Sequence, residues 1–95
     1  MTRSDIQVII RRSSITILTK YNQITFSPSG KAIAMFSTVQ FTKNMLSELE
    51  NSKIIEIERY TNSDDWCTVK IRKKFGFTND ALTNLLVYIL EKYKL

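Results

Sequence analysis

Residues 78–95 read TNDALTNLLVYILEKYKL, and this stretch decides the fold. Its apolar side chains recur at the i, i+3, i+4, i+7 spacing of one helix face, and they are Leu82, Leu85, Leu86, Ile89, Leu90 and Tyr93. Thr78 can cap the first turn, and Asp80 complements the positive end of the helix dipole. The stretch therefore predicts a helix that crosses the core, with Leu86 and Ile89 almost fully buried.

The first third of the chain has a different period. Residues 6–36 alternate apolar and polar side chains and are rich in Ile, Thr, Val and Phe, which is typical of half-buried strands. The last two strands join through a Ser-Pro-Ser-Gly turn at residues 27–30, where Pro presets φ and Gly can supply a positive φ. Four short strands are expected, at residues 6–11, 15–21, 23–27 and 31–36.

The period changes again after Phe36. Ser37 or Thr38 can cap a helix that ends near Asn51 and Ser52. Its stability should come mainly from packing, because it is short. The side chains expected on its inner face are Phe41, Met45, Leu46 and Leu49.

A second hairpin is expected at residues 53–61 and 66–74. Cys67, Val69 and Ile71 share one face of its second strand, and we expect that face to point inward. Alternation then places Tyr60 opposite Trp66 on the outward face. The chain as a whole is predicted to form one α+β domain over residues 1–95, with about six short antiparallel strands and two helices in the order β-β-β-β-α-β-β-α.

Composition narrows the classes of function. The 95 residues are 43% hydrophobic and 24% charged, which is ordinary for a folded soluble protein. They contain neither an apolar run long enough to span a membrane nor a good signal peptide, so we expect a cytoplasmic protein that does not bind membranes. Cys67 is the only cysteine and histidine is absent, so we expect neither a disulfide nor a metal ion or other cofactor.

The sequence contains few candidate catalytic residues. The sequence lacks histidine, a glycine-rich phosphate loop and a nucleophile motif. Asp64 and Asp65 stand together, but Asn62 and Ser63 before them are typical of a solvated hairpin tip. Cys67 falls on the inward face of its strand, where a structural thiol is expected. The sequence therefore predicts a protein that is not an enzyme.

The net charge of +5 is unevenly distributed. Residues 48–95 hold eight basic and eight acidic side chains, whereas in residues 1–47 Asp5 alone opposes six basic ones. A surplus of basic residues on a small domain indicates either that the protein binds a polyanion or that the charge only keeps the protein soluble. The six N-terminal cations are Arg3, Arg11, Arg12, Lys20, Lys31 and Lys43.

The sequence offers more candidate residues for nucleic-acid binding than for catalysis. Cations at strand ends can contact phosphates, and exposed aromatic groups can stack on bases. The alternative for each cation alone is a solvated surface charge. The candidate nucleic-acid-binding residues are Arg11, Arg12, Lys31, Lys70, Arg72, Lys73 and Lys74, with Tyr60 and Trp66 as the aromatic groups.

The order of elements in residues 23–95, with GKAIAMF at residues 30–36 after the first turn, resembles the C-terminal DNA-binding domain of the phage middle-gene transcription activator MotA. The resemblance covers about three quarters of the chain. It implies a double-wing fold, a saddle of paired hairpins with helices between them, that binds duplex DNA through the hairpins. The sequence carries no counterpart of that activator's N-terminal helical domain, which contacts the host polymerase. DNA binding is thus implied more directly than activation by the same route.

We therefore expect a small regulatory protein that binds nucleic acid, with duplex DNA favoured, encoded by a phage and acting in the host cytoplasm. The competing class is a protein-binding module that inhibits or redirects a host enzyme through a strand edge or an aromatic face. The sequence leaves open whether the protein is a monomer or a homodimer paired through a sheet edge.

Overall fold

The structure is a computed structural model that describes residues 5–95. Arg3, which was counted among the N-terminal cations, lies outside the described residues. Six strands form one antiparallel sheet in the order β1-β2-β3-β4-β6-β5, which confirms the predicted α+β arrangement. The elements are β1 (Gln7–Ile10), β2 (Ile15–Leu18), β3 (Gln23–Ser29), β4 (Ala32–Ser37), α1 (Lys43–Asn51), β5 (Ile55–Asn62), β6 (Cys67–Lys73) and α2 (Asn79–Lys92).

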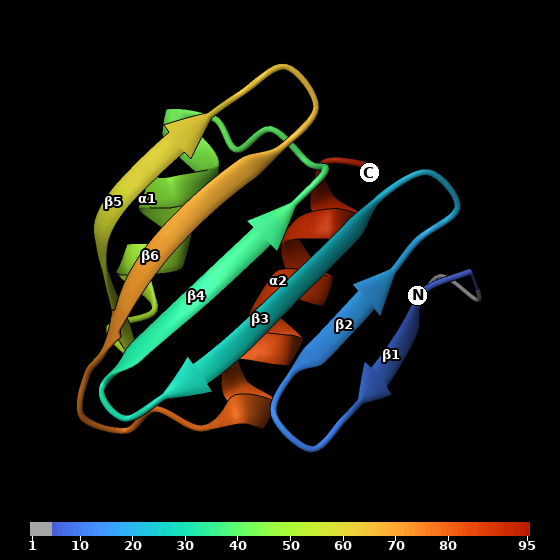
Figure 1. The fold of residues 1–95 in the computed structure, drawn as a ribbon. Helices are drawn as coiled ribbons and strands as arrows, with labels where there is room; N and C mark the ends of the chain where they lie inside the picture. Colours follow the sequence, from blue (N-terminus) through green and yellow to red (C-terminus); the bar gives the residue numbers. More distant parts are fainter. Residues whose placement is uncertain (1–4) are drawn as a thin grey trace.

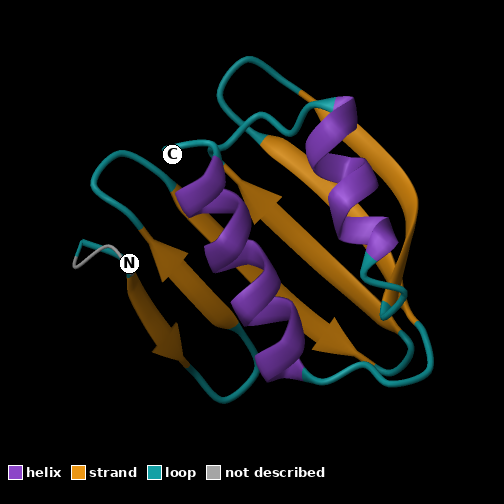
Figure 2. Ribbon diagram, turned by 180° about the vertical axis from the view of Figure 1, so that it is seen from behind, coloured by secondary structure: helices purple, strands orange, loops and turns teal. Residues whose placement is uncertain are grey.

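Both helices lie on the same face of the sheet (Figure 2). Helix α1 packs against β5 and α2 against β2. The other face, which is turned toward the reader in Figure 1, is covered by no element of residues 5–95. We call it the open face. Its side chains come from the strand positions that alternate with the core positions, so strand alternation separates an apolar side from a solvated one.

The core lies between the helices and the sheet. Side chains at alternate positions of the central strands, such as Phe26, Met35 and Val69, are fully buried against the helices. Leu86 and Ile89 are 0% exposed, as the periodicity predicted. The Thr78 hydroxyl accepts a hydrogen bond from the Ala81 N–H at 3.0 Å, which confirms the predicted cap of α2.

The predicted start of the first helix is wrong. Ser37 is the last residue of β4, where it pairs with Ile24 and Cys67. Its side chain is buried and accepts a hydrogen bond from the Val39 N–H at 2.8 Å, so it cannot cap a helix. Helix α1 begins after Thr42, whose hydroxyl accepts from the Met45 N–H at 3.3 Å. Pairing between distant strands therefore overrides a local capping signal.

The register of the second hairpin also differs from the prediction. Ile57 lies opposite Ile71, but the next pair is Arg59 with Lys70, because Glu58 is an extra residue in a β-bulge. Every later side chain of β5 is therefore on the face opposite to the one predicted. Tyr60 lies opposite Val69, on the helix-covered face and not on the outward face with Trp66.

Candidate nucleic-acid interface

Three turns lie at the same end of the sheet (Figure 1). They are the β1–β2 turn at residues 11–14, the β3–β4 turn at residues 30–31 and the turn at residues 74–77 that precedes α2. Antiparallel pairing brings the last two of these turns together, because Ala32 begins β4 opposite Arg72 near the end of β6, and the Lys73 N–H donates to the Lys31 carbonyl at 2.8 Å.

This end of the sheet collects cations that are far apart in sequence. Glu58 forms an ion pair with one of these cations, Arg72, with its Oε1 3.6 Å from the Arg72 Nε. Glu56 is the strand partner of Arg72, and Asp80 lies in the first turn of α2. The opposite end carries the β5–β6 turn with Asp64 and Asp65, and it also carries Lys20 in the β2–β3 turn and Lys43 at the start of α1. We call the first end the basic end, and its cations are Arg11, Arg12, Lys31, Lys53, Arg72, Lys73 and Lys74.

The turn before α2 holds an aromatic side chain in solvent. Phe75 is 101% exposed. The Phe77 N–H donates to the Lys74 carbonyl at 3.1 Å, and Gly76 has a φ of +89° that suits the third position of a type II turn. Phe77 packs on the core and Lys73 Nζ lies 5.2 Å from its ring centre, so the turn is anchored while Phe75 projects from it.

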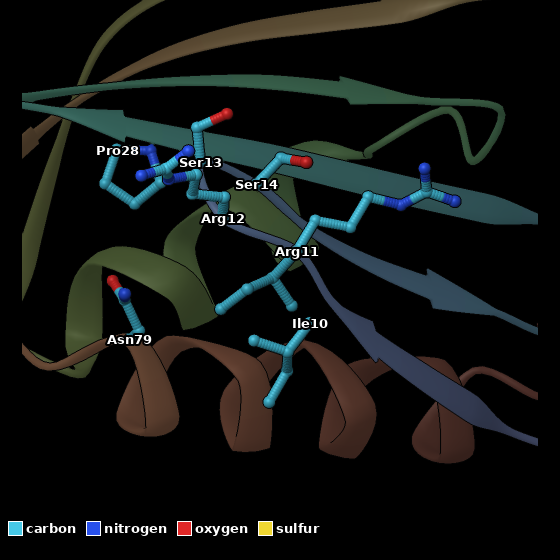
Figure 3. A pocket seen from close by; sticks show the side chains of 8 residues that line it. Ile10, Arg11, Arg12, Ser13, Ser14, Pro28 and Asn79 are labelled. Atoms are coloured by element: carbon cyan, nitrogen blue, oxygen red, sulfur yellow. The ribbon is translucent and has the colours of Figure 1, made fainter.

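A small pocket of about 140 Å³ lies at the basic end, between the β1–β2 turn and the start of α2 (Figure 3). Arg12, Ser13 and Ser14 line it from the turn, and Asn79 lines it from the first residue of α2. The Arg11 side chain extends away from Asn79 into solvent (Figure 3). Guanidinium and hydroxyl groups are common ligands of phosphate oxygens, and the pocket adds such groups to the charge of this end.

The other predicted residues lie elsewhere. Lys70 is exposed in the middle of the open face, opposite Ala34 and Arg59. Trp66 is 49% exposed, but it lies just before β6, at the end of the sheet opposite the basic end. Tyr60 is half-buried against the helix side, where its hydroxyl donates to the Phe41 carbonyl at 2.5 Å. The structure thus gathers the cations predicted at strand ends and separates them from both predicted aromatics.

Four exposed side chains were not identified from the sequence, two at the basic end (Lys53 and Phe75) and two on the open face (Phe36 and Arg59). Lys53 precedes β5 and was counted only in the charge balance. Phe36 occupies one of the alternate positions of β4 that point away from the core, so strand alternation could have predicted that it is exposed. Arg59 reaches the open face only because of the bulge at Glu58, and Phe75 stands in solvent only because of the turn geometry, so alternation alone identifies neither.

The thiol and the carboxylates offer little chemistry. Cys67 is fully buried, and burial raises the pKa of its thiol, which keeps it protonated at neutral pH. Within residues 5–95 there is no group of three or more Asp, Glu or Cys side chains placed to hold a metal ion. No helix in this range is both long and apolar enough to cross a membrane.

Comparison with known proteins finds no matching family model, and no curated protein or solved structure significantly similar to this chain.

Proposed function

We propose that this protein binds duplex DNA through the basic end and acts as a small regulatory protein. The observation that carries the proposal is the convergence of cations from the 11–14, 30–31 and 74–77 turns at one end of the sheet. A phosphate backbone attracts such a cluster because binding releases condensed counterions. The resemblance of residues 23–95 to a double-wing domain supports the same ligand, since hairpins are its DNA-contacting elements.

Phe75 gives the basic end a second kind of contact. It is a fully exposed aromatic held between Lys74 and Gly76. Apolar side chains at this kind of position insert beside base steps, and neighbouring cations neutralise the flanking phosphates. In the proposed complex the cations set the affinity and Phe75 contacts the bases.

Charge reversal at the basic end tests the proposal. Lys31→Glu combined with Lys74→Glu changes two exposed side chains of two different turns. We expect the affinity for a labelled 20-base-pair duplex at about 50 mM salt to fall at least tenfold, because repulsion replaces two phosphate contacts. Fluorescence anisotropy measures the affinity, and circular dichroism confirms that the variant folds.

The matched control is Lys20→Glu combined with Lys43→Glu, which makes the same change in net charge away from the basic end. We expect it to lose much less affinity than the basic-end variant. Equal losses would show that net charge and not the basic end controls binding. If the parent protein binds no duplex even at low salt, the proposal fails and the protein-binding module takes its place.

A further inference from the structure

The open face contains a depression of about 310 Å³ that is separate from the turns of the basic end. Its floor is made of small side chains from the two central strands, and two long cations stand at its side. The volume is at the lower end of the range for small-ligand pockets, about 300–1,000 Å³. The side chains that line it from the open face are Ser27, Ser29, Ala32, Ala34, Arg59, Thr68 and Lys70.

The two cations face each other directly. Arg59 and Lys70 are cross-strand partners, and like charges at opposed positions are destabilising. Among residues 5–95 neither is ion-paired, because the nearby Glu58 carboxylate pairs with Arg72, with Oε1 3.6 Å from its Nε. The bulge creates this arrangement, since without the extra residue Arg59 would point to the core side. An anion held between the two side chains would relieve the repulsion.

An exposed aromatic lies beside the depression. Phe36 occupies the next open-face position along β4 after Ala34, opposite Thr25 and Thr68, and it is 46% exposed. A planar group could stack on its ring and extend over the alanine and serine floor. Ser27 and Ser29 would then offer hydroxyls to the edge of that group.

We propose that this depression binds an unpaired nucleotide of a single-stranded nucleic acid, with the base on Phe36 and the neighbouring phosphate between Arg59 and Lys70. Stacking platforms flanked by cations are the usual means of binding single strands. Bases inside a duplex present only their edges, so a ring on a flat sheet face cannot stack on them without unstacking the helix. This site is distinct from the duplex contact proposed for the basic end, and it does not depend on it.

Filling the depression is the first test. Ala34→Leu adds bulk to the floor on the solvent side of the sheet, away from the core. The matched control is Thr61→Leu, which adds similar bulk to an exposed position of β5 on the same face, opposite Thr68 and outside the depression. We expect the affinity for labelled 12-nucleotide oligo(dT) and oligo(rU) to fall at least fivefold in Ala34→Leu and less than twofold in Thr61→Leu. Comparison of the two oligonucleotides shows whether the affinity depends on deoxyribose or ribose in the backbone.

Removing the stacking ring is the second test. We expect Phe36→Ala to weaken oligo(dT) binding by at least about fivefold and Phe36→Trp to retain it, because stacking tolerates any aromatic ring. Affinity for a duplex should change less than twofold in both variants, so loss of this site is distinguishable from loss of the basic-end contact. Thermal melting of each variant establishes that it is folded.

Three results would overturn the proposal. The first is oligonucleotide binding that is unchanged by Ala34→Leu and Phe36→Ala in folded protein. The second is the absence of oligo(dT) and oligo(rU) binding at about 50 mM salt. The third is competition by polyglutamate as effective as competition by unlabelled oligo(dT), since the depression would then recognise charge alone, as a site for an acidic protein does.

Discussion

At the scale of single residues, Tyr60 determines how β5 sits on the core. Its hydroxyl donates to the Phe41 carbonyl, which ties the bulged half of β5 to the segment that leads into α1. Burial is the main reason that the pKa of Tyr60 is raised, so the phenol stays protonated and remains a donor at neutral pH. The contact exists only because the extra residue Glu58 turns Tyr60 toward the helices.

Removing this hydroxyl is expected to destabilise the fold. Tyr60→Phe leaves the buried Phe41 without its partner, and we expect the free energy of unfolding to fall by about 1 kcal/mol, or the melting temperature by about 4–8 °C. Chemical denaturation of the parent and the variant measures the difference. Trp66→Phe is the control, since Trp66 is half exposed and outside the strands. Equal stability of parent and Tyr60→Phe would mean that Tyr60 points outward, as simple alternation predicts.

At the scale of elements, the two helices are joined by one carboxylate. Glu48 of α1 accepts hydrogen bonds from Lys92 Nζ at the end of α2 and from the Tyr93 hydroxyl, the latter at 2.7 Å. The Lys92 bond, followed by the Tyr93 bond, lowers the pKa of Glu48 below its ordinary value of 4.5. The folded state therefore favours the ionised carboxylate more than the unfolded state does.

This lowered pKa predicts an acid-sensitive contribution to stability. The contribution is fully present above the ordinary pKa of Glu48 and is lost as the pH falls through the lowered pKa of the folded state. We expect the free energy of unfolding to decrease more steeply in the parent than in Glu48→Gln between about pH 5 and pH 3. Urea denaturation at several pH values checks this, with Glu91→Gln as the control. Parallel curves for the parent and Glu48→Gln would contradict the role of Glu48.

The elements also show what the sequence can predict. Helix α2 was predicted correctly because its signals are local: a threonine cap, an acidic first turn and a periodic apolar stripe. The start of α1 was predicted wrongly, because Ser37 belongs to β4 and pairs with β6, and this pairing joins residues about thirty positions apart in the sequence. The face of Tyr60 was missed for a related reason, since a bulge changes parity without changing the residue pattern.

At the scale of the whole molecule, topology decides which cations are neighbours. The sequence identifies Arg12, Lys31 and Lys74 as residues at or near strand ends, but only the strand order places those ends together. The described chain measures 31 × 27 × 23 Å. Duplex DNA carries one negative charge for about every 1.7 Å of its axis, so a surface of this width meets several phosphates at once.

The salt dependence of duplex binding tests the central claim most directly. Seven cations at the basic end set an upper limit of about −6 on the slope of log affinity against log salt, at about −0.9 for each phosphate contact. We expect Lys31→Ala combined with Lys74→Ala to flatten the measured slope by about two units, and Lys20→Ala combined with Lys43→Ala to leave it unchanged. Equal slopes for the parent and the Lys31/Lys74 variant would contradict phosphate contact at the basic end.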